Sequence, residues 1–164
     1  MSEITRGGHA SPSIATRINW LGNRLVTTAS ATYGQIGLGF LDARLLNLLC
    51  RLPDITAARI SEILGVDAAA VSRAVKSLKA RKLVAEARGP LRSLSLTDEG
   101  RALGRQTRKI SDERESRLMQ GFSEQEIDQM LVLVNRLLEN MAGVALIAEQ
   151  VPEVIGEARV AEAG

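Results

Sequence analysis

The sequence predicts a mainly α-helical protein with a small β-hairpin, built as a winged helix-turn-helix core with helices on each side. Residues 56–66 and 67–81 have the apolar spacing of two short helices joined by a tight turn. Residues 83–88 and 92–96 then have the features of two short strands around a Gly-Pro turn. A helix-turn-helix followed by a hairpin is a winged helix.

Two amphipathic helices are expected before this core. Ser11 and Pro12 are residue types typical of an N-cap and of the first helical position, so the first helix should begin there. The second should stop before Pro53, because the residue before a proline avoids the helical conformation. Their apolar stripes consist of Ile14, Ile18, Leu21 and Leu25 in the first and of Leu41, Leu45, Leu48, Leu49 and Leu52 in the second.

The helix-turn-helix has clear boundary signals and a second helix with two opposite faces. Gly65 can adopt the left-handed conformation that ends helices, and Asp67 is a good N-cap at the positive end of the next helix dipole. A cationic face on that helix fits a DNA groove, but the solvated side of an ordinary amphipathic helix has the same composition. The apolar face consists of Val71, Ala74, Val75 and Leu78, and the polar face of Ser72, Arg73, Lys76 and Lys79.

Charge is distributed unevenly, although the net charge is only +2. Residues 59–92 carry eight Lys or Arg against three acids, whereas residues 120–164 carry two Arg against eight acids. This asymmetry is expected when one face of a protein meets phosphates. A solvated surface without a partner can also show it.

Further helices should follow the hairpin. Thr97 is a suitable cap for a helix that runs to about Gln120, and Ser123 with Glu126 forms a capping box for another. The last apolar stripe can pack within its own subunit or against a second one, and the tail from about Gln150 should be frayed or marginally helical. This stripe consists of Ile127, Met130, Leu131, Val134, Leu137, Leu138 and Met141.

From about Leu41 to Gly104 the chain resembles the MarR family of winged-helix transcription regulators. The resemblance implies a homodimer that binds a pseudo-palindromic operator and is released by a small ligand or by oxidation. We expect a repressor rather than an activator. The segments that carry the resemblance, in order along the chain, are Ile55-Thr56, Ile63 to Val66, Val71-Ser72-Arg73, Leu78 with Arg81 to Val84, and Leu96 to Gly100.

The family architecture divides the chain into four expected regions. In that family the terminal helices interlock across a two-fold axis, which favours a dimer as the use of the flanking helices here. A symmetric dimer would place its two reading helices roughly 34–36 Å apart, in successive major grooves. The regions are an N-terminal dimerisation helix at 11–37, a DNA-binding region at 38–104, C-terminal dimerisation helices at 105–147, and a tail at 148–164.

The side chains of the second helix suggest how DNA would be contacted. Arg73 can donate two hydrogen bonds to guanine or hold a phosphate, whereas lysines are point charges suited to phosphates. Ala69 offers only a methyl contact, where relatives often carry polar residues, so more of the specificity should come from DNA shape. The residues expected to contact DNA are Thr56, Ala69, Ser72, Arg73, Lys76, Lys79, Arg88 and Arg92.

Two further departures from the family concern the hairpin. The loop from Arg88 to Arg92 is shorter than is usual, so its reach into the minor groove should be reduced, and either arginine can also be read as a solvated turn residue. Lys82 stands where many relatives have Gly, which makes the exit from the reading helix strained or differently capped.

Composition argues against catalysis, cofactors, metals and membranes. The chain has one His and one Cys, no phosphate-binding glycine loop, and no apolar run near the 18 or so residues of a membrane span. We therefore expect no catalytic residue, no metal site and no cofactor, and a cytoplasmic protein. The alternative to a DNA-binding regulator is a winged-helix module for protein contacts, with weak or no DNA binding.

The sequence gives weaker signals for a ligand site than for DNA contacts. Trp20, Arg24 and Tyr33 could line the pocket that MarR-like dimers form, or could serve in packing. Because aromatic residues are only 2% of the chain, any pocket should be aliphatic and suit an apolar or phenolic ligand. Cys50 lies among leucines and reads as a small buried hydrophobic residue or, alternatively, as a redox switch.

Overall fold

A computed structural model describes residues 11–87 and 92–141 of the 164-residue chain. The chain divides into two compact units whose border lies between Glu113 and Arg114. The first unit contains the helix-turn-helix and the sheet, and the second contains the last helix of the described part. Within the described residues, none of the helices combines the length and the apolar character that a membrane span requires.

The first helix, α1 (Ile14–Gly34), begins two residues later than the sequence predicts. Its N-cap is Ser13, whose hydroxyl oxygen accepts a hydrogen bond from the amide of Thr16 at 3.2 Å. The expected cap at Ser11 was therefore wrong. Ser11 instead accepts a hydrogen bond at 2.8 Å from Arg17, one turn inside the helix. Two serines spaced by one proline offer the same cap chemistry, and Ser13 is the one that lies next to the helix.

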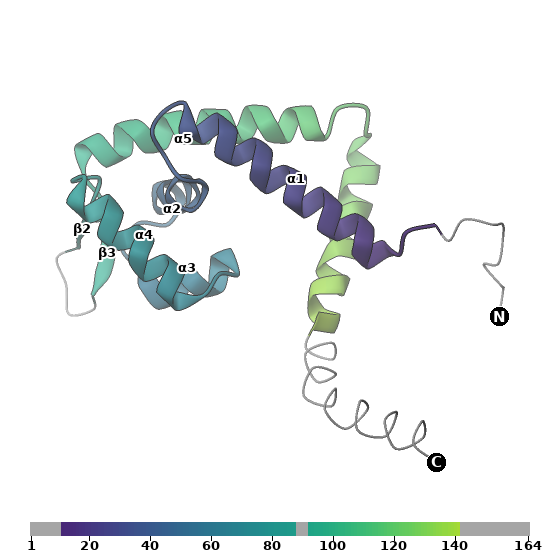
Figure 1. Cartoon of the computed structure of the whole chain (residues 1–164), viewed down its shortest axis with the longest axis horizontal. Coiled ribbons are helices and arrows are strands. Elements are labelled where there is room, and N and C mark those ends of the chain that lie inside the picture. Colours follow the sequence, from purple (N-terminus) through teal and green to yellow (C-terminus); the bar gives the residue numbers. More distant parts are fainter. Residues whose placement is uncertain (1–10, 88–91, 142–164) are drawn as a thin grey trace, which may run out of the picture. The chain divides into compact units, whose positions relative to one another are not determined.

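Helix α2 (Phe40–Arg51) is the centre of the first unit, as its leucine-rich sequence predicts. It contacts α1, α3, α4 and β3, and Figure 1 views it nearly along its axis. Leu45 and Leu46 are fully buried, because a helix with neighbours on several sides buries more than one stripe. The helix ends just before Leu52 and Pro53, where the sequence predicts a stop.

The helix-turn-helix consists of α3 (Ala57–Leu64) and α4 (Ala68–Ala80). Gly65 ends α3 with φ +61° and ψ +40°, the left-handed conformation expected for it. Asp67 caps α4, and its carboxylate accepts a hydrogen bond from the amide of Ala70 at 2.8 Å. Both boundary predictions are confirmed.

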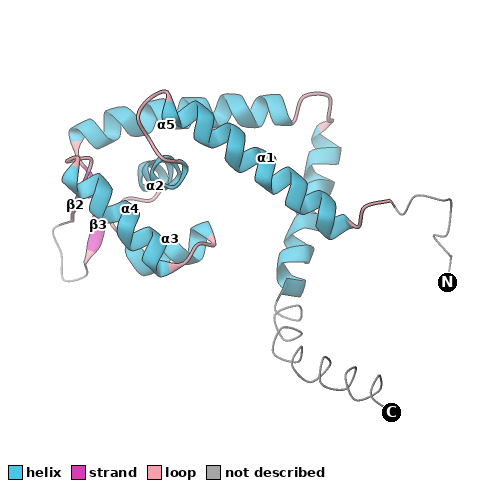
Figure 2. Cartoon of the chain, in the orientation of Figure 1, coloured by secondary structure: helices cyan, strands magenta, loops and turns pink. Residues whose placement is uncertain are grey.

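The sheet has three antiparallel strands in the order β1-β3-β2, whereas the sequence predicts only the hairpin of β2 and β3. The strands are β1 (Ile55–Thr56), β2 (Val84–Glu86) and β3 (Ser93–Leu96). They are short beside the helices (Figure 2). The two residues of β1 pair with Leu94 and Ser93, and a segment that short has no alternation for sequence reading to detect.

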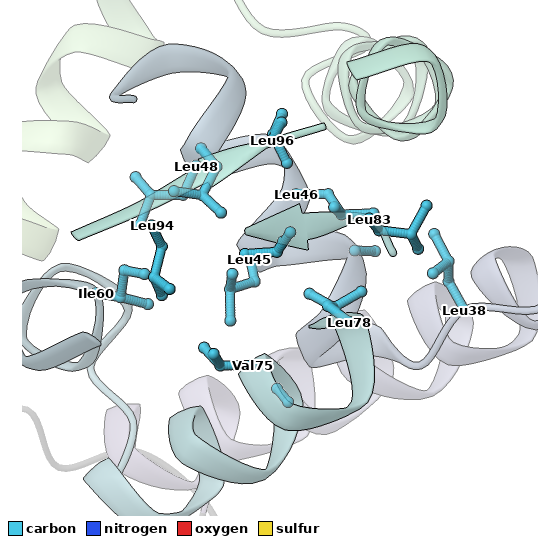
Figure 3. Close-up of a cluster of buried hydrophobic side chains, with 14 of the residues drawn as sticks. Leu38, Leu45, Leu46, Leu48, Ile60, Val75, Leu78, Leu83, Leu94 and Leu96 are labelled. Atoms are coloured by element: carbon cyan, nitrogen blue, oxygen red, sulfur yellow. The ribbon is translucent and has the colours of Figure 1, made fainter. Parts of the chain in front are cut away.

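Aliphatic side chains from the helices and the sheet form one core. Figure 3 shows leucines from α2, α4 and β3 gathered in this cluster. All four residues of the predicted apolar face of α4 are buried, and Val71 and Leu78 are completely so. Burying each such side chain contributes about 1.5–3 kcal/mol. The inner face of α4 is thereby fixed, and its outer face is held in one orientation.

Helix α5 (Asp98–Leu118) follows the sheet and packs closely on its neighbours through two glycines, Gly100 against the segment between α4 and β2 and Gly104 against α2. A Cβ atom on Gly100 would lie 1.9 Å from the carbonyl oxygen of Leu83, and one on Gly104 would lie 2.5 Å from the sulfur of Cys50. The hydroxyl of buried Thr107 lies 2.7 Å from the side-chain oxygen of Asn47 on α2. Small residues therefore let α5 approach α2 closely.

The predicted caps of the last two helices are confirmed. The hydroxyl of Thr97 accepts a hydrogen bond at 3.0 Å from the amide of Gly100, at the start of α5. In the second unit, the amide of Ser123 donates to Glu126 at 2.8 Å and the amide of Glu126 donates to Ser123 at 3.3 Å. This reciprocal pair is a capping box for the helix at residues 124–141. The expected tail lies outside the described residues.

Candidate nucleic-acid interface

The outer face of α4 is a cationic surface held by a rigid core. Ser72, Arg73 and Lys76 are exposed on the side opposite the buried valines and leucine. Within residues 11–87 and 92–141, these three side chains have no hydrogen bond or ion pair. Their donors are therefore available for a partner outside the chain.

Lys79 differs from its neighbours on this face. Its ammonium lies 2.7 Å from the carboxylate of Glu86 on β2, and its side chain is 35% exposed. The hydrogen bond and the charge of Lys79 hold the pKa of Glu86 below its usual range. The sequence predicts Lys79 as a phosphate contact, but the structure shows that its charge is already engaged across the α4–β2 junction.

The N-terminal turn of α4 and the start of α3 present few free donors. Ala68 and Ala69 are exposed, so this turn offers methyl groups, as the sequence predicts. The hydroxyl of Thr56 caps α3 by accepting from the amide of Arg59 at 3.3 Å. Arg59 in turn pairs with Glu62 at 2.7 Å. A hydroxyl that accepts a cap bond still has its own hydrogen to donate.

The wing residues are only partly within the described structure. Arg92 is exposed at the start of β3, and its charge also acts on Glu86 across the hairpin. Arg88 and the tip of the loop lie outside the described residues. The cation at Arg92 extends the positive surface from α4 towards the hairpin.

The chain leaves α4 through a residue in the left-handed conformation. Lys82 has φ +58°, so a lysine occupies the left-handed conformation. The amide of Leu83 bonds to the carbonyl of Leu78 and the amide of Lys82 to that of Lys79, both at 2.9 Å. These two bonds form a Schellman motif, and Leu78 and Leu83 are both buried in the same hydrophobic core. Of the two alternatives that the sequence leaves open, a strained exit or a different cap, the left-handed Lys82 shows the first.

Arg81, beside it, has a structural role. Its guanidinium donates a hydrogen bond at 3.0 Å to the carbonyl of Gly37, in the link between α1 and α2. Arg81 therefore ties the end of α4 to the N-terminal part of the chain, and its charge is less available to DNA than that of Arg73.

The three residues expected to line a ligand pocket do not share one environment. Tyr33 is buried in the core, while Trp20 and Arg24 are exposed on α1. Cys50 is partly buried and lies against Gly104. Burial raises the pKa of its thiol, and the charges of Arg108 and Arg105 lower it in part.

Two cavities of the first unit were missed by sequence reading, and neither is purely aliphatic. One, of about 340 Å³, lies between α2, β3 and α5, and the other, of about 300 Å³, lies between α2, α3 and α5. The expectation of an aliphatic pocket was wrong for both, because each is lined by three arginines. The signal that could have shown the first is the spacing of Arg101, Arg105 and Arg108, which places them on one face of a helix.

Comparisons with known proteins agree on one family. The model of the MarR family matches residues 36–92. A MarR/EmrR family transcriptional regulator from Acinetobacter sp. ADP1 is 32% identical, with a TM-score of 0.73, and the match covers 79% of this chain and 94% of that one. Comparison with curated protein sequences found no match.

Two more distant structures were solved with DNA, and their likeness concerns the fold alone. A MarR family regulator from Listeria monocytogenes complexed with 26mer DNA is 20% identical, with a TM-score of 0.74 and coverage of 85% of this chain and 96% of that one. The S. aureus MepR–DNA complex is 21% identical, with a TM-score of 0.70 and coverage of 79% and 96%. With its relative from Acinetobacter matched over nearly the whole length, the chain belongs to the MarR family of transcriptional regulators.

Proposed function

We propose that this regulator binds double-stranded DNA as a homodimer, with α4 of each subunit in a major groove of a pseudo-palindromic operator. The observation that carries the proposal is the exposed outer face of α4, where Arg73, Lys76 and Ser72 have no partner among the described residues. An α-helix fits the major groove, and arginine can read guanine or hold a phosphate. The two distant relatives solved with DNA support the same use of the fold.

Two unpartnered apolar faces support the homodimer. In the first unit, Ile14, Ile18 and Leu21 of α1 are about half exposed or more. In the second unit, seven large apolar side chains of the helix at 124–141 are 43–64% exposed. Exposed patches of this kind mark interaction sites, and a second copy of the chain would cover both faces by symmetry. The seven are Leu131, Val132, Leu133, Val134, Leu137, Leu138 and Met141.

Repression follows from where such a dimer would sit. A protein that occupies two successive major grooves blocks other proteins from the same face of the DNA. Release then requires only that a ligand favour a dimer geometry with a different separation of the two reading helices. We therefore propose a repressor that a small ligand releases.

Fluorescence anisotropy with the DNA upstream of the protein's own gene tests DNA binding. The expected result is tight, sequence-selective binding that weakens with salt by about 0.9 log units per phosphate contact and decade of salt. Arg73→Ala should lose about 1–3 kcal/mol of binding free energy, because it removes a groove contact from an exposed position. Circular dichroism should show an unchanged fold.

The matched control is Lys109→Ala, which removes one positive charge from an exposed position of α5. It should leave operator affinity nearly unchanged. Equal losses for Arg73→Ala and Lys109→Ala would mean that net charge, and not the face of α4, governs binding. An absence of binding to any duplex at low salt would favour the protein-contact module instead.

A further inference from the structure

The arginines around the helix-turn-helix differ in what they contact. Arg73 is exposed on the outer face of α4. Arg44 and Arg81 instead each donate a hydrogen bond to a main-chain carbonyl of another segment. Arg44 lies on α2 and reaches the turn before α4, whereas Arg81 is the C-cap of α4 itself. The two bonds therefore hold the chain at the two ends of α4.

Arg44 joins α2 to the turn that leads into α4. Its guanidinium donates to the carbonyl of Leu64 at 2.8 Å and lies 5.5 Å from the ring centre of Phe40, on its own helix. Leu64 is the last residue of α3, so its carbonyl belongs to those that the helix's own hydrogen bonds leave without a partner. The arginine is half-buried, so water competes less for this bond than it would at the surface.

The turn itself is fixed, so the position of Leu64 decides where α4 begins. Gly65 follows in the left-handed conformation. The amide of Val66 donates to the carbonyl of Ser61 at 3.2 Å, and the hydroxyl of Ser61 donates to the carbonyl of Val66 at 2.5 Å. The next residue, Asp67, is the N-cap of α4. A rigid turn of this kind carries the anchor on α2 to the first turn of α4.

Arg81 joins the other end of α4 to the link between α1 and α2. Its guanidinium donates to the carbonyl of Gly37 at 3.0 Å, where the chain is left-handed with φ +68°. The next residue, Leu38, is buried in the core, so this link has a fixed place. Burial raises the pKa of half-buried Asp42 on α2, and the charge of Arg81 lowers it in part. The guanidinium therefore lies near this carboxylate as well.

We propose that Arg44 and Arg81 are positioning residues for operator recognition, each fixing one end of α4 without touching DNA. The inner face of α4 packs through apolar contacts, which are not directional and leave the tilt of a helix weakly defined. Charge-assisted hydrogen bonds are directional, and one at each end defines the tilt. Contacts to base edges need this tilt more than attraction to phosphates does. The inference rests on the proposed function.

Salt dependence separates a positioning arginine from one that contacts phosphate. Arg44→Met and Arg81→Met keep an apolar stem and remove the guanidinium. Anisotropy at several salt concentrations compares the duplex from upstream of the gene with a scrambled duplex. Each variant should bind the upstream duplex about tenfold more weakly, with an unchanged salt slope and unchanged affinity for the scrambled duplex. Loss of a phosphate contact would instead reduce the slope by about 0.9 for each contact and weaken both complexes.

Matched variants exclude simpler explanations. Arg51→Met removes an exposed arginine from the end of α2 and should change neither affinity. Arg44→Lys and Arg81→Lys keep a charge and a donor, and each should bind the upstream duplex more tightly than the corresponding methionine variant. All titrations are made well below the melting temperature measured by circular dichroism. Partial unfolding would lower the affinity for both duplexes in the same proportion, so the ratio of the two affinities reports positioning. If Arg44→Met does not fold, Arg44→Lys compared with the unaltered protein takes its place.

Three results would overturn the inference while the proposed function stands. They are a salt slope that falls with the affinity, an equal loss on both duplexes, and variants that bind the upstream duplex as tightly as the unaltered protein does. If the unaltered protein binds neither duplex at low salt, the proposed function fails and the inference fails with it. The behaviour of the unaltered protein therefore distinguishes the two failures.

Discussion

Single residues at the exit of α4 decide how the helix-turn-helix meets the sheet. The chain reverses through the left-handed Lys82, and its next residue, Leu83, brings a carbonyl so close to Gly100 that any side chain there would collide. The hydroxyl of Thr97 closes the same junction by donating to the carbonyl of Lys82 at 2.7 Å. The position of α4 relative to α5 thus depends on a few backbone contacts at which larger side chains are excluded.

Lys82→Gly should stabilise the protein. A left-handed conformation costs an L-residue roughly 1–2 kcal/mol, and glycine avoids this cost but loses about 0.4–1 kcal/mol through the greater freedom of the unfolded chain. We expect the free energy of unfolding to rise by roughly 0.5–1 kcal/mol, as a higher urea midpoint with the same slope. Lys82→Ala keeps the Cβ atom and should give no such gain. An equal gain in both variants would show that loss of the lysine charge is the cause.

Elements were predictable from the sequence where local signals and packing agree. Asp67, Thr97 and Ser123 mark helix starts because their side chains satisfy free amides, which requires no knowledge of the rest of the fold. The start of α1 was misplaced because Ser11 and Ser13 have equal chemistry. Strand β1 was missed because its two residues exist as a strand only through pairing with β3, which is distant in sequence.

The candidate site was predictable to a similar extent. The periodicity of α4 shows which side chains face outwards, and Arg73 and Lys76 are exposed as predicted. The partners of Lys79 and Arg81 could not be predicted, because Glu86 and Gly37 reach them through tertiary contacts. The cavity between α2, β3 and α5 could not be predicted for the same reason, because it is formed by segments that are distant in sequence.

The ion pair between α4 and β2 should weaken DNA binding. Glu86 engages Lys79 and places a negative charge beside the positive face, so Glu86→Gln would free the lysine for a phosphate. We expect roughly three- to tenfold tighter operator binding at low salt, with a salt slope steeper by about 0.9. Anisotropy titrations at several salt concentrations measure both. Glu115→Gln, which removes an exposed acid from α5, is the matched control, and an equal gain there would exclude a specific effect of the ion pair.

At the scale of the whole molecule, the two units differ in how much of their apolar surface is buried within one chain. The first unit buries a continuous aliphatic core within one chain. In the second, the helix at 124–141 leaves most of its large apolar side chains exposed, although its capping box shows a helix with a well-defined start. A helix of this composition gains most of its stability from packing and not from intrinsic propensity. The sequence left open whether this stripe packs within its own subunit, and its exposure favours a second copy.

Val134→Arg with Leu138→Arg should convert the proposed dimer into a monomer. The two side chains are 47% and 64% exposed in the single chain, so charging them should leave the fold of the first unit intact while opposing association. Sedimentation should show twice the monomer mass for the unaltered protein and the monomer mass for the variant. Operator affinity should then fall towards the range of non-specific binding, about 10⁻⁴–10⁻⁶ M, because one half-site contact remains.

Gln129→Arg adds a charge to an exposed polar position of the same helix and should stay dimeric. A charged variant that remains a dimer would place the interface elsewhere, and a monomeric variant with unchanged operator affinity would contradict the two-groove arrangement.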